Sequence, residues 1–144
     1  MNANDLNILL VEDNPADVRL ITEALKEKKI QNRLTVAEDG FEALSYLRRE
    51  GGYENAPRPH LILLDLNLPK KNGHEVLEEI KTDENLRRIP VIILTTSTNE
   101  QDIRKSYDLH ANCYINKPVD FTRWIRIVEG IENFWFTIVK IPME

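Results

Sequence analysis

Short aliphatic runs, each followed by polar residues, recur along the chain. Three of them, Ile8–Val11, Leu61–Leu64 and Pro90–Leu94, are continuous, which is typical of strands buried on both faces of a parallel sheet. Two weaker segments, at residues 34–37 and 113–116, mix polar and apolar positions. We therefore interpret them as strands at the edges of the same sheet.

Amphipathic helical segments follow the predicted strands. The first helix is expected to begin after Asn14, which suits an N-cap, with Pro15 at the first helical position. The fourth helix is expected to be capped by Thr98, because Gln101 three residues later completes a capping-box pattern. Apolar residues at steps of three and four predict a long last helix from about residue 120 to beyond residue 135.

These alternating units predict an α/β, flavodoxin-like doubly wound (βα)5 fold. Its five-stranded parallel sheet has the order 2-1-3-4-5 with helices on both faces, because this order places the two mixed strands at the edges. We expect a single domain over residues 1–144, with a core of about residues 6–133, a C-terminal extension at 134–144 and no effector domain.

Composition narrows the classes of function. The 144 residues carry 19 Lys and Arg against 24 Asp and Glu, a net charge of −5, which disfavours nonspecific binding of nucleic acid. No apolar run approaches the roughly 20 residues of a membrane-spanning helix, and no basic segment precedes the first run. The single cysteine, Cys113, excludes a disulfide framework within one chain and fits a reducing compartment. We expect a cytoplasmic protein with no membrane or nucleic-acid partner.

Polar side chains fall just beyond the carboxyl ends of four predicted strands. Glu12 and Asp13 follow the first strand, Asp65 the third, Thr95 the fourth and Lys117 the fifth. In an open α/β sheet these ends converge on one crevice, at the point where the strand order reverses. Clustered carboxylates repel one another and need a cation, and oxygen ligands favour a hard ion such as Mg²⁺.

Four segments, taken in order, resemble the receiver domain of two-component response regulators, and the match covers nearly the whole chain. They are Leu9–Asn14, Leu63–Pro69, Leu94–Thr95 and Tyr114–Pro118. The loop of residues 51–59 and the aromatic residues 134–136 are similar to those of single-domain regulators that partner bacterial and cyanobacterial phytochrome-type histidine kinases. The resemblance implies a phosphorylated signalling protein whose only catalysis is its own phosphorylation and slow dephosphorylation.

By position, the resemblance implies a role for each residue of the crevice. Asp65 is expected to accept the phosphoryl group, and Lys117 to pair with a phosphoryl oxygen. The Lys117–Pro118 peptide bond is expected to be cis, which aims the ammonium inward. Four residues are implied to hold Mg²⁺ or its bound water: Glu12, Asp13, Asp65 and, through its backbone carbonyl, Asn67.

The same resemblance implies a conformational switch. The hydroxyl of Thr95 is expected to bond the phosphoryl group, and the ring of Tyr114 to turn into the space that Thr95 vacates. The surface of the fourth helix, fifth strand and fifth helix then changes as the populations of two conformations shift. Thr96 stands where receivers commonly have Ala or Gly, so we expect it to slow access to Asp65.

The last helix carries a second apolar stripe beside the one that docks it on the sheet. One interpretation is a homodimer contact, because large exposed aromatic patches usually mark an interface. The other is a wide core face with the C-terminal tail folded back. The residues expected at the partner surface are Ile127, Ile131, Phe134, Trp135 and Ile138.

Other functions fit the residues less well. An aspartyl phosphatase of the haloacid-dehalogenase type needs a second Asp two residues after the nucleophile, where this chain has Asn67. A flavodoxin needs a first loop of Ser, Thr and Gly, whereas Glu12 and Asp13 would repel a phosphate. A degenerate receiver that acts as a constitutive docking module is a further alternative, although every acidic residue of the crevice is present.

Overall fold

A computed structural model describes residues 6–27, 32–138 and 140, with the backbone alone at 136–138. The strands are β1 (Leu6–Val11), β2 (Asn32–Ala37), β3 (Leu61–Leu64), β4 (Val91–Thr95) and β5 (Cys113–Asn116). The α-helices are α1 (Pro15–Lys26), α2 (Gly40–Arg48), α3 (Gly73–Thr82), α4 (Glu100–Asp108) and α5 (Phe121–Ile131), and a π-helical segment, η1 (Glu132–Ile138), follows α5 directly.

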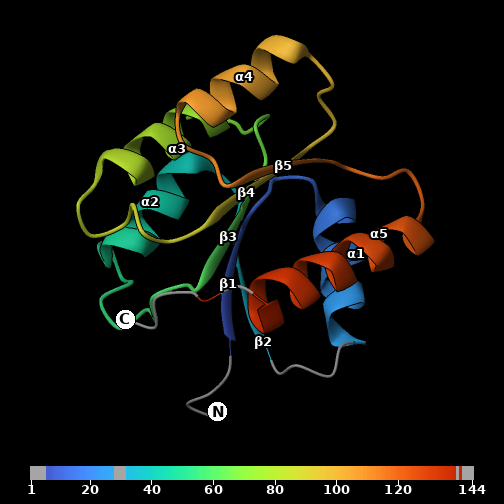
Figure 1. Cartoon of the computed structure of the whole chain (residues 1–144). Helices are drawn as coiled ribbons and strands as arrows, with labels where there is room; N and C mark the ends of the chain where they lie inside the picture. Colours follow the sequence, from blue (N-terminus) through green and yellow to red (C-terminus); the bar gives the residue numbers. More distant parts are fainter. Residues whose placement is uncertain (1–5, 28–31, 139, 141–144) are drawn as a thin grey trace.

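The strands form one parallel sheet with helices on both faces. Its order is β2-β1-β3-β4-β5, so the predicted fold class and both edge strands are confirmed. Helices α1 and α5 lie together on one face, and α2, α3 and α4 cover the other (Figure 1). The carboxyl ends of all the strands therefore point to one end of the molecule.

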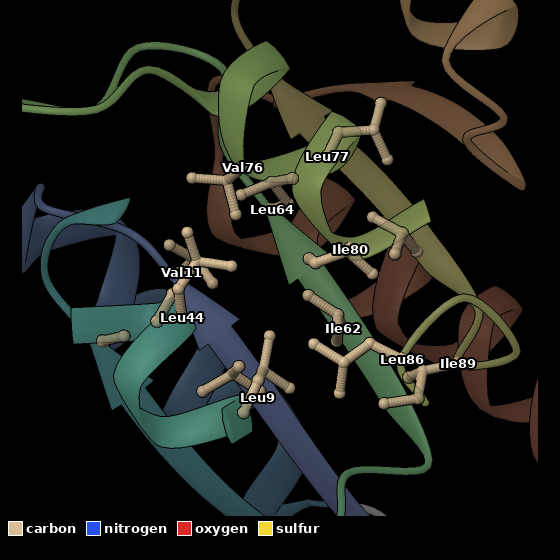
Figure 2. Packing of buried hydrophobic residues seen from close by; sticks show 14 of the residues in the cluster. Leu9, Val11, Leu44, Ile62, Leu64, Val76, Leu77, Ile80, Leu86 and Ile89 are labelled. Carbon is tan, nitrogen blue, oxygen red and sulfur yellow. The ribbon is translucent and has the colours of Figure 1, made fainter. Parts of the chain in front are cut away.

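The continuous apolar runs arise because both faces of the central strands are buried. In β1, Leu9 and Val11 belong to the cluster beneath α2 and α3, whereas Ile8 and Leu10 belong to the cluster beneath α1 and α5. Figure 2 shows the first cluster, with Leu9 and Val11 facing side chains from α2 and α3. Alternate residues of a strand point to opposite faces of the sheet. When helices cover both faces, every residue of the strand is buried and apolar residues follow one another without interruption.

One of the two predicted N-caps is confirmed and the other is wrong. The Asn14 side-chain oxygen accepts hydrogen bonds from the backbone N–H groups of Ala16 at 2.9 Å and Asp17 at 3.3 Å, so the cap of α1 is confirmed. The expected cap of α4 at Thr98 is wrong. Asn99 caps this helix, because its amide oxygen already accepts the N–H of Gln101 at 2.8 Å.

The last helix is α-helical for less of its length than the sequence predicted. The α-helix ends at Ile131 and the chain continues in the wider π-helical turns of η1. Most of the apolar stripe expected to dock this helix on the sheet is buried. Trp124, Val128, Ile131 and Trp135 are buried, whereas Phe121, expected in the same stripe, is 38% exposed. No helix in the described part of the chain is long and apolar enough to cross a membrane.

Candidate functional site

Charged residues from three loops meet at the carboxyl end of the sheet. The Lys117 ammonium lies 2.5 Å from Glu12 Oε1 and 3.2 Å from Asp65 Oδ2. All three side chains are nearly inaccessible, with 6% of Lys117, 2% of Glu12 and 6% of Asp65 exposed. Thr95, at the end of β4, is also buried. The predicted convergence of these residues is therefore what the fold produces.

Backbone hydrogen bonds fix the loops that carry the charges. The N–H of Asp65 donates to the carbonyl of Val11 at 3.1 Å, so the loop after β3 is held against the end of β1. The N–H of Lys117 donates to the carbonyl of Thr95 at 2.7 Å, which holds the loop after β5 against β4. Hydrogen bonds of the kind that pair the strands thus also hold together the loops that form the crevice.

Burial and charge together shift the protonation equilibria in the crevice. Burial, followed by the charge of Asp65, raises the pKa of Glu12 to about 7, although the hydrogen bond from Lys117 opposes this shift. Burial alone would lower the pKa of Lys117, but its hydrogen bonds to Asp17 and Glu12 and the charge of Asp65 outweigh burial and raise it. Lys117 is therefore a permanent cation facing a surplus of carboxylates.

Three carboxylates of the crevice have the arrangement of a cation site. One ligand atom from each of Glu12, Asp13 and Asp65 lies within 4.8 Å of the others. The Oδ1 atom of Asp65 is buried and has no hydrogen-bond partner, which is costly for a carboxylate oxygen unless a cation binds it. The residues present therefore fit a hard divalent ion such as Mg²⁺. The part expected of the Asn67 carbonyl stays a prediction.

One residue of the crevice was missed by sequence reasoning. Asp17, in the first turn of α1, places Oδ2 2.8 Å from the Lys117 ammonium. An acidic residue in the first turn of a helix is ordinarily explained by the helix dipole, so the presence of an aspartate at position 17 did not by itself indicate a site residue. Its position could have indicated one, because α1 starts at the carboxyl end of β1, where Glu12 and Asp13 already lie.

Similarity to known proteins now identifies the chain. The family model described as the response regulator receiver domain matches residues 8–129. The chain belongs to this family. The receiver is 53% identical to the response regulator Rcp1 of Synechocystis over 94% of its own length and 92% of Rcp1. It is 49% identical to the probable methanogenesis regulatory protein FilR2 of Methanothrix harundinacea, over 94% and 86% of the two chains.

Solved structures agree with this assignment. The phosphorylated cyanobacterial phytochrome response regulator RcpA is 56% identical, with a TM-score of 0.92 over 96% of the receiver and 99% of RcpA. Rcp1 has been solved in a Mn²⁺-bound form, 52% identical, with a TM-score of 0.90 over 95% and 99% of the two chains. The divalent metal expected from the sequence is thus supported by a relative and by the donor set in the crevice. The family also makes the receiver a signalling protein rather than an enzyme, and implies a histidine kinase as its partner.

The peptide bond after Lys117 differs from the expectation. It is trans, and so is every other peptide bond in the described residues, so the predicted cis Lys117–Pro118 bond is wrong in this structure. With this trans bond the Lys117 ammonium lies 3.2 Å from Asp65 Oδ2, so a cis bond is not required to bring the ammonium into the crevice. A trans bond is also the more stable form before proline.

The two expected switch residues are linked through Ser97. The Ser97 N–H donates to the Thr95 hydroxyl at 3.4 Å, and the Tyr114 hydroxyl donates to the Ser97 carbonyl at 2.9 Å. The Ser97 hydroxyl in turn donates to Asp102 of α4 at 2.7 Å. Thr96, the residue expected to hinder access, is exposed beside them. Thr95 and Tyr114 thus contact one loop that also holds α4.

The expected partner surface on the last helix is only partly exposed. Ile131 and Trp135 are 7% and 9% exposed, so they serve the core of the chain itself, whereas Phe134 is 49% exposed. The side chain of Ile138 lies outside the described residues. An apolar groove of about 290 Å³ runs between β5 and the last helix, lined by Cys113, Ile115, Ile127, Gly130, Ile131, Phe134 and Trp135.

Proposed function

We propose that the receiver is phosphorylated on Asp65 by a histidine kinase. The observation that carries this proposal is the buried, unpartnered Oδ1 of Asp65, whose other carboxylate oxygen, Oδ2, lies 3.2 Å from the ammonium of Lys117. A carboxylate suits the reaction because it is already ionised and gives an acyl phosphate that can be hydrolysed.

The phosphotransfer step uses groups that the crevice already holds. An Asp65 carboxylate oxygen forms a bond to phosphorus while the phosphorus–nitrogen bond of a phosphohistidine breaks, and the imidazole nitrogen keeps the electron pair. Lys117 pairs with an equatorial phosphoryl oxygen, where it stabilises the charge. Glu12, Asp13, Asp65 and the Asn67 carbonyl would hold Mg²⁺. When bound, the ion neutralises phosphoryl oxygens in the transition state.

Intact-protein mass tests the proposal directly. Incubation with Mg²⁺ and acetyl phosphate should add one phosphoryl group to the protein, and EDTA should prevent the gain. Asp65→Asn should abolish it, whereas Asp83→Asn, a carboxylate near the opposite end of the sheet, should leave it unchanged. A wild-type mass that does not change, together with no binding of beryllofluoride, would instead favour a docking module without phosphorylation chemistry.

Thr95 couples phosphorylation of Asp65 to a conformational change outside the crevice. Once Asp65 carries a phosphoryl group, the Thr95 hydroxyl turns toward it and weakens its contact with the loop at Ser97. Tyr114 and α4 both bond that loop, so both are released together. The Tyr114 ring signals in a ¹³C-labelled NMR spectrum should shift on beryllofluoride binding in the wild type and not in Thr95→Ala.

The phosphorylated receiver acts through a second copy of itself, downstream of a phytochrome-type kinase. Similarity to the phytochrome response regulator RcpA supports the type of kinase, and the exposed Phe134 beside an apolar groove supports the homodimer. Light-scattering mass should show a dimer that Phe134→Ser abolishes. Phe41→Ser is a matched control, because Phe41 is an aromatic residue of similar exposure on α2. A monomeric wild type, with and without phosphorylation, would contradict the dimer.

A further inference from the structure

Asp17 is a carboxylate of the crevice with no part in the phosphotransfer described above. It lies in the first turn of α1, where Asn14 caps the helix and accepts the N–H of Asp17 itself at 3.3 Å. Its side chain is 20% exposed, and Oδ2 lies 2.8 Å from the ammonium of Lys117, a residue 100 positions further along the chain. The contact joins the first turn of α1 to the loop after β5.

The Lys117 ammonium is fully occupied in this structure. It has three N–H donors, and three carboxylates lie within reach: Glu12 at 2.5 Å, Asp17 at 2.8 Å and Asp65 at 3.2 Å. A phosphoryl oxygen can bond the ammonium only if one of these contacts is given up. The carboxylate that keeps its hydrogen bond to Lys117 then determines the position of the ammonium during the reaction.

Two of the three carboxylates have another task when the crevice is loaded. Asp65 becomes the phosphorylated group, and Glu12 belongs to the cluster that would hold the metal. Asp17 is not a member of that cluster, so it is the carboxylate that stays free to hold Lys117. Its backbone is fixed by the N-cap of α1, which makes it a rigid anchor.

We infer that Asp17 is a positioning residue for the phosphorylation of Asp65. It holds Lys117 by one N–H while the other two turn from Glu12 and Asp65 to the phosphoryl oxygens. The ammonium is then already aligned when the phosphoryl group arrives, and no freedom of a long side chain has to be lost in the reaction. The inference rests on the proposed function and deepens it.

The test compares Asp17→Ala, which removes the hydrogen-bond acceptor, with Asp17→Asn, which keeps an oxygen in the same place. Initial rates of phosphorylation by acetyl phosphate should fall at least about tenfold in Asp17→Ala, as expected for the loss of one hydrogen bond to a charged group. Asp17→Asn should stay within about twofold of the wild type by the same reasoning, because its amide oxygen restores the acceptor. Glu23→Ala, which removes an exposed carboxylate on the same helix, should leave the rate unchanged.

A double-mutant cycle shows whether Asp17 acts through Lys117. The affinity for beryllofluoride, measured by ¹⁹F NMR, should fall in Asp17→Ala, and the change should disappear in the Lys117→Met background. A purely structural role of Asp17 would give the same fall in both backgrounds.

Three results would overturn the inference. They are an Asp17→Ala rate equal to the wild type, an Asp17→Asn rate as low as that of Asp17→Ala, and an effect on beryllofluoride affinity that persists without Lys117. A wild type that neither gains a phosphoryl group from acetyl phosphate nor binds beryllofluoride contradicts the proposed function instead. If beryllofluoride binds but acetyl phosphate does not react, the beryllofluoride cycle still decides the role of Asp17.

Discussion

Replacement of Gly73 by alanine should displace the phosphoacceptor without touching its side chain. Gly73 is the first residue of α3, and its N–H donates to the carbonyl of Leu66 at 2.9 Å, directly after Asp65. A Cβ atom at Gly73 would lie 2.5 Å from Leu66 Cα and against the carbonyl oxygen of Asp65. These neighbours are backbone atoms at the end of β3, so no flexible side chain can move aside to make room.

The size of the effect follows from this overlap. Ordinary contact with a Cβ atom begins at 3.4 Å, so Leu66 Cα has to move by 3.4 − 2.5 = 0.9 Å or α3 has to retreat by as much. Forcing a methyl group into a packed site costs about 1–3 kcal/mol in free energy of unfolding. A misplacement of about 1 Å at a reacting group can slow a reaction about 100-fold. We therefore expect a destabilised protein that is phosphorylated 10- to 100-fold more slowly.

Urea denaturation and intact-mass kinetics with acetyl phosphate measure the two effects separately. Gly130→Ala is the matched control, because a Cβ atom at Gly130, inside α5, meets nothing within 4 Å. That substitution should stabilise the protein by about 0.5–1 kcal/mol through helix propensity and leave the phosphorylation rate unchanged. If Gly73→Ala unfolds at the wild-type urea concentration and is phosphorylated at the wild-type rate, the close approach of α3 to Asp65 does not exist in solution.

Three further predictions concern α3 and α5. Asn72→Ala should lower the free energy of unfolding in urea by about 1–2 kcal/mol, because the side-chain oxygen that accepts the N–H of Glu75 is lost. An unchanged urea midpoint would contradict the cap. Burial lowers the pKa of His74, so the unfolded state binds the proton more tightly, and the contribution of His74 to stability falls as the pH drops from 7 to 5, opposite to that of Glu12, whose pKa is raised. The stability of His74→Gln relative to the wild type should therefore increase between pH 7 and pH 5 in thermal unfolding, and a constant difference would contradict this. Trp124→Ala should cost about 3–5 kcal/mol in urea unfolding, because this fully buried side chain docks α5; a cost below 1 kcal/mol would refute that packing.

The fold was predictable because burial on two faces leaves a continuous aliphatic run in the sequence. Leu61–Leu64 shows this most plainly, since every residue of β3 is buried. The two edge strands were recognisable for the opposite reason, because β2 and β5 each have an incompletely covered face. The location of the residues that follow these strands, Asp65 above all, could then be predicted from the strand order, because the carboxyl ends of the strands meet at one crevice.

The details that could not be predicted depend on contacts between residues far apart in the sequence, or on a choice between two neighbouring residues or two isomers that suit the same position. Asp17 bonds Lys117 across 100 residues, and a first-turn carboxylate has the same appearance whether or not it has such a partner. Thr98 and Asn99 both suit an N-cap, and only the backbone geometry decides between them. The Lys117–Pro118 bond is a third example, because the sequence fixes the proline but not the isomer.

Chemical trapping of the phosphoryl group tests the central claim most directly. Borohydride reduces an aspartyl phosphate to homoserine, and peptide mass spectrometry then locates the modified residue. The receiver, phosphorylated with acetyl phosphate and Mg²⁺, should yield homoserine at position 65 and at no other acidic residue of the crevice. Homoserine at Asp13 or Asp17, or its absence from a protein that has gained a phosphoryl group, would contradict Asp65 as the phosphoacceptor.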